Sequence, residues 1–358
     1  MSSYTTNASN ELTATSNATY TYDSNGNTLT KTVGSNTTTY AWDYENRLTS
    51  ITLPANGGTV TFKYDPAGKR IYKSSSAGTS IYAYDDDNLI EETNASGVVV
   101  ARYSQELNVD EPMAMLRSGA TSYYDADGLG SVTSLTNSSG TAAEIYTYDS
   151  FGNLTASSGS ITNPFQFTGR ESDPETGLYY YRARYNDPKI GRFITEDPLQ
   201  FGSGDSNFYN YVAQNPVNYT DPSGRTRFHG NWCGPDWTGG LVEEYRPDHS
   251  KLYKDPVDAE DEVCRHHDIC YFNARISNPC DPPSRSHAMA KCDLIFGAEM
   301  PNTFTGYWLV DAIYLHHFFP DAGPNRGPCP SCSAGNSSGG PGVGTIDQAI
   351  NIGMHALP

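Results

Sequence analysis

The chain has 358 residues and a formal net charge of −18 at pH 7. Because nucleic-acid phosphates are bound through clustered Lys and Arg, this acidity weighs against nucleic acid as a partner. The longest apolar stretch, residues 307–319, contains Asp311 and is too short to cross a bilayer, so we expect no transmembrane anchoring.

Cysteine usage divides the chain into two parts. The sequence has seven cysteines, and the first of them is Cys233. A change of composition of this kind marks a domain boundary. We therefore expect two modules, the first without cysteine and the second able to form disulfides.

The first module repeats a short phrase in which an aromatic residue precedes an aspartate. Around these phrases, Thr, Val and aromatic positions alternate with polar ones and then break at Asx-Gly turns. The pattern predicts short antiparallel strands joined by hairpins, an all-β repeat array whose tyrosines stack while their hydroxyls stay in water. The phrases are Tyr22-Asp23, Trp42-Asp43, Tyr64-Asp65, Tyr84-Asp85, Tyr124-Asp125 and Tyr148-Asp149.

These phrases resemble the YD repeat of Rhs and teneurin-like proteins. The next stretch of the chain resembles the Rhs-associated core, and residues 177–188, 191–198 and 215–224 carry that resemblance. The implied divisions are a flexible N-terminus (1–14), YD/Rhs repeats (15–162) and the Rhs-associated core (163–225).

The core of that family ends at an Asp-Pro-x-Gly phrase, here residues 221–224. The segment beyond this phrase differs between members and is often a toxin, released when the shell cleaves its own chain. Such cleavage needs paired carboxylates that share a proton, and the candidates are Asp197 and Asp221, with Arg192 nearby in sequence to tune them. Arg225 stands where Leu is common in the family, and the alternative interpretation of Asp-Pro is a simple turn.

In the second module, residues 264–271 place a base, a carboxylate and two thiols on a predicted helix. At about 100° per residue, Cys264, His267, Asp268 and Tyr271 share one helix face. A face with this composition is not a plain apolar stripe. We interpret it as a candidate active site.

A second predicted helix places a carboxylate among apolar residues. Met289, Cys292, Asp293 and Phe296 recur at three- and four-residue spacing, so Asp293 lies in an apolar seam. A buried carboxylate needs a hydrogen-bond donor. The economical donor is His267, which would keep its other ring nitrogen free as a general base.

A glycine-rich loop over residues 229–240 precedes both helices, and its exposable carbonyls beside Asp268 suit calcium. Together with Cys-x-x-His-Asp-x-Cys-Tyr and the later Cys-Asp pair, this loop resembles the calcium-dependent secreted phospholipase A2 family. The resemblance implies a small, mostly α, disulfide-containing domain over 226–328. A Gly/Ser-rich flexible tail over 329–358 would come after it.

On matching positions, the resemblance implies that His267 deprotonates water and that Asp293 orients it. The Gly234 N–H and Ca²⁺ would stabilise the oxyanion that forms as water attacks the sn-2 ester of a phospholipid. The implied calcium ligands are Asp268 and the carbonyls of Trp232, Gly234 and Asp236. The implied disulfides are Cys233–Cys264 and Cys270–Cys292.

Three alternatives compete with a calcium-dependent lipase. Cys264, His267, Cys270 and Cys292 could bind a structural zinc ion, although ligands at successive three-residue steps of one helix do not converge on a single ion. The second module could instead be a catalytically inactive calcium-binding or lipid-binding domain. The whole chain could also be a structural cell-surface repeat protein.

The two modules together predict a delivered toxin, with a β shell in front of an enzyme that degrades phospholipid membranes. The N-terminus has no signal peptide, whereas the expected disulfides need an oxidising compartment. We therefore expect delivery to a periplasm or extracellular target by a non-classical route. We also expect a neutralising immunity protein as a partner.

Overall fold

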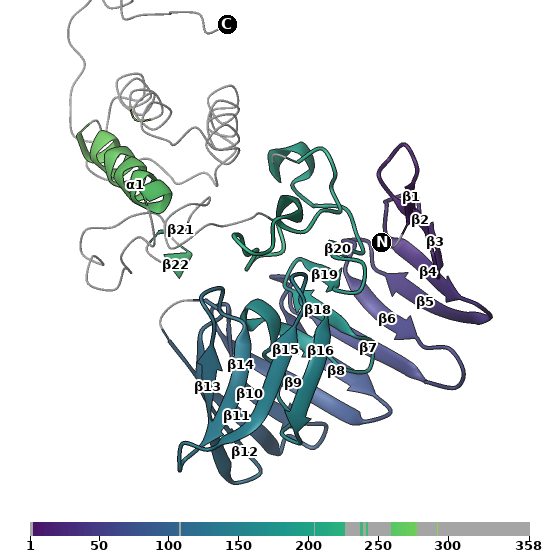
Figure 1. Ribbon diagram of the computed structural model, residues 1–358, viewed down its shortest axis with the longest axis horizontal. Helices are drawn as coiled ribbons and strands as arrows, with labels where there is room; N and C mark the ends of the chain where they lie inside the picture. Colours follow the sequence, from purple (N-terminus) through teal and green to yellow (C-terminus); the bar gives the residue numbers. More distant parts are fainter. Residues whose placement is uncertain are drawn as a thin grey trace, which may run out of the picture.

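The computed structural model describes residues 3–106, 109–203, 205–225, 237–238, 241–242, 259–277 and 292. Sixteen strands form one sheet in which each strand pairs with the next one in the chain, and every pair is antiparallel (Figure 1). The strands are β1 (Tyr4–Thr6), β2 (Leu12–Thr15), β3 (Thr19–Tyr22), β4 (Thr28–Val33), β5 (Asn36–Trp42), β6 (Leu48–Thr52), β7 (Thr59–Tyr64), β8 (Arg70–Ser75), β9 (Gly78–Asp85), β10 (Asn88–Asn94), β11 (Val99–Gln105), β12 (Pro112–Arg117), β13 (Ala120–Ala126), β14 (Val132–Asn137), β15 (Ala142–Tyr148) and β16 (Leu154–Gly159).

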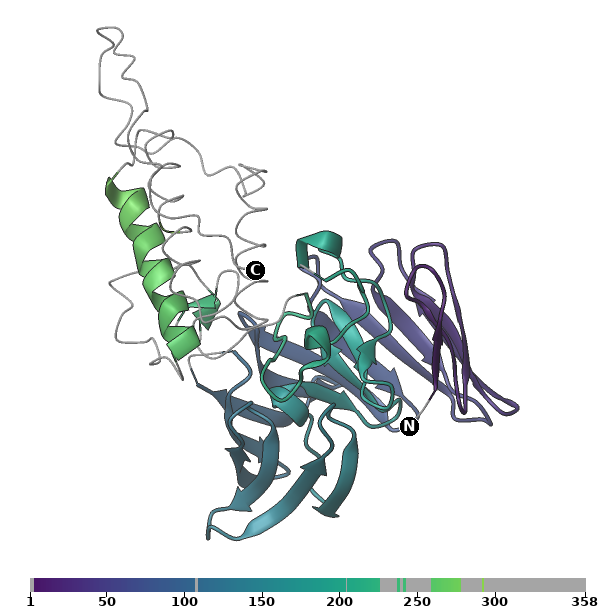
Figure 2. The same ribbon diagram turned by 45° about the horizontal axis from the view of Figure 1, so that its top comes forward.

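A smaller four-stranded sheet comes after the long one in the chain and lies within its curve (Figures 1 and 2). Its strands are β17 (Glu171–Asp173), β18 (Leu178–Tyr181), β19 (Arg184–Asp187) and β20 (Arg192–Phe193). The short 3₁₀ helices are η1 (Phe167–Gly169), η2 (Gln200–Ser203) and η3 (Val212–Gln214). The remaining described elements are β21 (Trp237–Thr238), β22 (Leu241–Val242) and helix α1 (Ala259–Ser277). Among the described helices, none has the length and apolar character that crossing a membrane requires.

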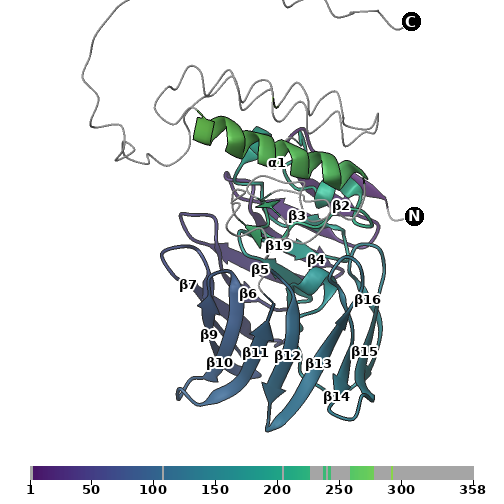
Figure 3. The same ribbon diagram turned by 90° about the vertical axis from the view of Figure 1, so that its left-hand side faces the viewer.

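The core lies between the long sheet and the segment that contains the small sheet (Figure 3). In one cluster, Tyr40, Ile51 and Phe62 of the long sheet pack against Tyr180 and Tyr185 of the small one. A second cluster joins strands β9 to β12, β14 and β15 to the segment before β17. The buried face of each strand therefore covers residues far away in sequence, and aromatic rings supply much of the apolar area.

In five of the six repeats the aromatic residue links neighbouring hairpins through its polar atom, whereas the Tyr124 hydroxyl donates to Oδ1 of Asn163. The Tyr64 hydroxyl donates to the Leu48 carbonyl oxygen at 2.7 Å, and the Tyr148 hydroxyl donates to that of Val132 at 2.9 Å. Burial raises the pKa of Tyr64 and of Tyr148 above the usual value. The expectation that these hydroxyls stay in water is therefore wrong, because the small sheet covers them and each needs a protein acceptor.

In four of the six repeats the aspartate closes the hairpin turn, and after Tyr124-Asp125 it is Asp127 that does so. Oδ1 of Asp23 accepts the backbone N–H groups of Asn25 and Asn27, each at 2.9 Å. Gly26, between them, has a φ of +76°, and a Cβ at this position would lie 2.7 Å from the Tyr209 hydroxyl. This turn therefore requires glycine both for its backbone conformation and for its close approach to Tyr209.

Strands β1 and β2 belong to the sheet, so the flexible N-terminus expected over residues 1–14 is a wrong prediction for the residues of these strands. β1 pairs antiparallel with β2, and Leu12 is fully buried beside Ala18 and Tyr20. The sequence suggested flexibility because residues 1–14 contain no aromatic-Asp phrase. The strands form because Leu12 covers an apolar surface that the next hairpin presents.

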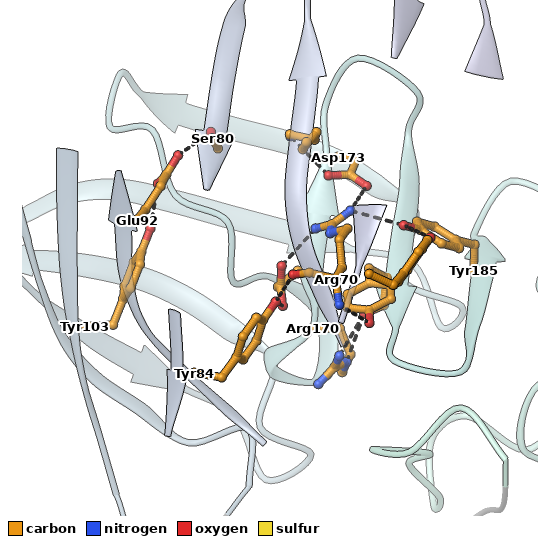
Figure 4. A network of polar contacts seen from close by, with 12 residues as sticks. Arg70, Ser80, Tyr84, Glu92, Tyr103, Arg170, Asp173 and Tyr185 are labelled. Carbon is orange, nitrogen blue, oxygen red and sulfur yellow. Dashed lines mark hydrogen bonds and ion pairs between the residues drawn. The ribbon is translucent and has the colours of Figure 1, made fainter. Parts of the chain in front are cut away.

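An ion-pair network fixes strand β8 to strand β17 (Figure 4). Arg70 is only 1% exposed, with its guanidinium nitrogens 2.8 Å from Glu171 and 2.5 Å from Asp173. Lys73 lies 3.0 Å from the other oxygen of Asp173, and the Tyr180 ring lies 4.5 Å from the Arg70 guanidinium carbon. Burial raises the pKa of Asp173, but Arg70 and Lys73 outweigh burial and leave that pKa below its usual value.

Candidate self-cleavage site

The turn at residues 221–224 packs against the hairpin turn that joins β18 to β19. The Ala183 N–H donates to the Ser223 carbonyl oxygen at 3.3 Å. Gly224 has a φ of +68°, and a Cβ there would lie 2.0 Å from the Tyr181 carbonyl oxygen. The glycine of the Asp-Pro-x-Gly phrase is therefore required, because no side chain fits between the two turns.

Arg184 brings the two predicted aspartates together. One of its terminal nitrogens lies 2.8 Å from Oδ2 of Asp197 and 3.3 Å from Oδ2 of Asp221. All three side chains are buried. The guanidinium carbon also lies 3.6 Å from the centre of the Phe193 ring, which covers the arginine on one side. Two carboxylates thus share one cation away from bulk water.

Burial changes the protonation of this cluster. Removal from water raises the pKa of Asp197 to about 6. The Arg184 cation and the Leu199 N–H lower this pKa but do not outweigh burial, and the negative charge of Asp221 raises it further. Burial also lowers the pKa of Arg184, although both carboxylates oppose that shift. Asp197 can therefore exchange a proton close to neutral pH.

The peptide group between Gly224 and Arg225 is held at both ends. The Nε–H of Arg184 donates to the Gly224 carbonyl oxygen. The Arg225 N–H donates to Oδ1 of Asp221 at 3.0 Å. A cation thus faces the oxygen that would become negative during attack on this carbonyl, and a carboxylate faces the nitrogen that would leave.

A second arginine holds the same turn from the other side. Arg182 donates to the Pro222 carbonyl oxygen and contacts both oxygens of Asp110, at 2.8 Å and 3.1 Å. Arg170 pairs with the same carboxylate and donates to the Tyr180 carbonyl oxygen at 2.8 Å. Because Asp110 belongs to the turn before β12, the long sheet itself helps to position residues 221–224.

The role predicted for Arg192 is wrong. Its Nη2 donates to the Asn10 carbonyl oxygen at 2.6 Å and lies 3.5 Å from Oδ1 of Asn207, and its guanidinium carbon lies 4.9 Å from the Tyr209 ring centre. Neither Asp197 nor Asp221 is among its ion-pair partners. Proximity in sequence misled the prediction, because antiparallel pairing of β19 and β20 directs Arg184 to the aspartates instead.

Sequence reasoning missed Arg182, Arg184 and Asp110. A usable signal was present, since Arg182 and Arg184 interrupt a run of aromatic residues expected to be buried. A buried arginine needs a carboxylate or several carbonyl acceptors. The sequence offered no means of choosing among many aspartates, and Asp110 in particular lies far away along the chain.

The second module is described only in part. Helix α1 contains Cys264, which is buried and disulfide-bonded, and Cys270, which is bonded to Cys292 with a Cα–Cα distance of 5.8 Å. The resemblance to the secreted phospholipase A2 family implied the same pairing for Cys270. The zinc alternative is wrong, because these cysteines form disulfides and cannot also act as thiolate ligands.

The remaining predicted residues of the second site are placed only in part. Asp268 lies on α1 and is partly buried, whereas His266 is exposed, with its Nε2 3.0 Å from Oε1 of Glu262. The backbone of His267 is helical. The residues and groups outside the described part of the chain are Trp232, Cys233, Gly234, Asp236, Asp293, the side chain of His267 and the tail 329–358.

Comparison with known proteins gives matches in the first module. The family model Teneurin YD-shell matches residues 110–217, and the model RHS Repeat matches residues 42–79. The tRNA3(Ser)-specific nuclease WapA of Bacillus spizizenii is 35% identical over 62% of this chain and 10% of its own length. The double-stranded DNA deaminase toxin A of Burkholderia cenocepacia is 31% identical over 38% of this chain and 11% of its own length.

The chain spans about a tenth of the length of these relatives. Among solved structures, the Photorhabdus luminescens Tc holotoxin pore with the mutation TccC3-D651A is 17% identical, with a TM-score of 0.46 over 63% of this chain and 15% of the other. The RHS Repeat match precedes the Teneurin YD-shell match along the chain. The first module therefore matches the RHS Repeat and Teneurin YD-shell families over residues 42–79 and 110–217.

Proposed function

We propose that this chain is the shell end of a polymorphic-toxin-type Rhs protein, and that it cuts itself beside Arg225 to release the C-terminal segment. The observation that carries the proposal is the Gly224–Arg225 peptide group, held between Arg184 and Asp221 next to Asp197. The named toxin relatives support the class of protein. Their nuclease and deaminase activities belong to those proteins.

The proposed reaction is hydrolysis of one peptide bond. Asp197 takes a proton from water, and the hydroxide attacks the Gly224 carbonyl carbon. Arg184 stabilises the oxyanion, because its Nε–H already points at this oxygen. As the C–N bond breaks, Asp221 delivers a proton to the Arg225 nitrogen, and the two carboxylates share one proton between them.

Mapping the chain ends tests this function. The full chain, synthesised without protease, should yield two fragments, and mass spectrometry should find a new N-terminus at Arg225. A fragment that begins at Thr226 would contradict the assignment of the Gly224–Arg225 bond as the one that is cut. An intact chain after prolonged incubation in the folded state would contradict the proposal.

The rate of self-cleavage should fall in acid. The pKa of Asp197 lies at about 6, so the base is ionised above that pH and becomes protonated below it. We expect a loss of about tenfold for each unit below about pH 6, and a second fall in rate at higher pH, where the pair loses the proton that Asp221 must deliver. Chain collected unfolded from cell-free synthesis and refolded at a series of pH values would give the profile. A rate that rises as the pH falls below about 6 would contradict the assignment of Asp197 as base.

We further propose calcium-dependent phospholipase A2 activity for the released segment. The supporting observation is α1, where Asp268 lies between Cys264 and Cys270 and a disulfide joins Cys270 to Cys292, the residue before Asp293. His267 and Asp293 would form the dyad that activates water, and Asp268 would bind Ca²⁺ with the carbonyls of the 229–240 loop. The substrate would be a phospholipid membrane, and an immunity protein would protect the producing cell.

Fatty-acid release tests this second function. The full chain should hydrolyse the sn-2 ester of phosphatidylcholine or phosphatidylglycerol vesicles with Ca²⁺ present, and a chelator should stop the reaction. His267→Ala should lower the rate by at least about a hundredfold, whereas His266→Ala, at the exposed neighbouring histidine, should change it little. Equal activity of the two variants would contradict the proposed dyad. Hydrolysis of tRNA or deamination of DNA by the chain would favour a different toxin activity.

A further inference from the structure

A cavity of about 640 Å³ opens beside Arg192 of β20. It lies between β1, the turn after β15, the turn before β20 and the segment 207–214. Its volume is within the range of small-molecule sites, which is about 300–1,000 Å³. None of its lining residues takes part in the proposed cleavage. The lining residues are Tyr4, Asp149, Phe151, Pro188, Lys189, Ile190, Gly191, Arg192, Asn207, Asn210 and Gln214.

Arg192 differs from the other buried arginines of the described chain. Arg70, Arg170 and Arg184 each form an ion pair with at least one carboxylate. Arg192 is only 6% exposed, and no described carboxylate lies within ion-pair distance of it. Its Nε is buried and meets no acceptor, which is also true of Arg70, but its Nη2 donates to neutral oxygens, those of Asn10 and Asn207.

An unpaired buried cation is costly, and its surroundings compensate only in part. The Tyr209 ring lies 4.9 Å from the guanidinium carbon and offers a cation–π contact. Burial nevertheless lowers the pKa of Arg192. In a chain with a net charge of −18, an arginine left without a carboxylate beside a cavity is therefore unusual.

The one carboxylate in the cavity wall does not fill this role. Oδ1 of Asp149 accepts the N–H groups of Phe151 and Asn153, each at 3.0 Å, as the other turn aspartates do. We propose that the cavity binds a small ligand with a carboxylate or phosphate group, which pairs with Arg192. The walls formed by Tyr4 and Phe151 suit a ligand that also has an apolar body.

Nitrogen-15 NMR of the arginine side chains in the full chain tests this site. Titration with inorganic phosphate and, separately, with N-acetylglutamate should shift the Nε–H signal of Arg192 to saturation, and sodium chloride at equal ionic strength should not. The arm that saturates at lower concentration identifies the anionic group. No saturable shift with either probe would overturn the proposal.

Variants add a second measurement. Arg192→Met keeps the volume of the side chain but removes its charge, and it should weaken binding measured by calorimetry by about tenfold or more, since hydrogen bonds to charged groups are strong. Lys63→Met, which removes an exposed-face cation far from the cavity, should bind both probes as the unaltered chain does. Unchanged binding by a folded Arg192→Met chain would overturn the proposal. If Arg192→Met does not fold, the NMR titration of the unaltered chain still tests whether the cavity binds an anion.

Discussion

Replacing Asp221 by asparagine is expected to leave the chain uncut. The variant loses the carboxylate that faces the Arg225 nitrogen at 3.0 Å and can no longer share a proton with Asp197. Asp197→Asn should have the same effect, because it removes the base. Loss of a positioned acid or base costs about 10²–10⁴-fold in rate. Gel electrophoresis and mass spectrometry of refolded chain, followed over time, would measure it.

The matched control for these variants is Asp205→Asn. Asp205 belongs to the same segment, but its carboxylate contacts the Asn207 N–H and the Asn210 amide, and neither lies in the proposed site. This variant should cut at the normal rate. Circular dichroism should show equal strand content in all three variants. Cleavage at full rate by a folded Asp221→Asn chain would rule out the proposed mechanism.

Replacing Arg70 by methionine should destabilise the shell more than any surface change. The variant leaves Glu171 buried without a cation and leaves Asp173 with Lys73 alone. Removing one partner of a buried ion pair costs about 3–5 kcal/mol. Urea unfolding followed by tyrosine and tryptophan fluorescence would measure the shift in the transition midpoint of the shell.

Arg102→Met is the matched control for this prediction. Arg102 is 61% exposed and pairs with Glu91 at 2.8 Å. An exposed ion pair contributes about 0–1 kcal/mol, so the midpoint should hardly move. Glu171→Gln added to Arg70→Met should cost less than the sum of the two single changes, because the carboxylate that has lost its cation is then neutral. Equal midpoints for Arg70→Met and Arg102→Met would show that the network of Figure 4 does not stabilise the shell.

Much of the shell could be predicted from local chemistry. The Asx-Gly turns at residues such as Asp23 and Asp149 fix where each hairpin closes, and the alternation of residues between them fixes which face is buried. Sequential antiparallel pairing results, because short turns leave each strand beside the next. Strands β1 and β2 were missed because they depend on contacts made by Leu12 rather than on a turn motif.

The candidate site was predictable only by residue type. The sequence indicated that Asp197 and Asp221 act as a pair, and the fold places both on one nitrogen of Arg184. The sequence could not predict that Arg184 rather than Arg192 contacts the aspartates. The two arginines lie on adjacent strands, and only the strand pairing decides which one faces Asp197 and Asp221. The same pairing leaves Arg192 beside a cavity.

The sequence by itself determined the repeat array and indicated Asp197 and Asp221 as a pair. The repeat array depends on turn chemistry and alternation, which act over a few residues. The tertiary structure alone decided which charges meet: Arg70 with Asp173, Arg182 with Asp110, and Arg184 with Asp221. These partners are far apart in the chain, and they pair because the long sheet encloses the core segment, where a buried charge must find an opposite one.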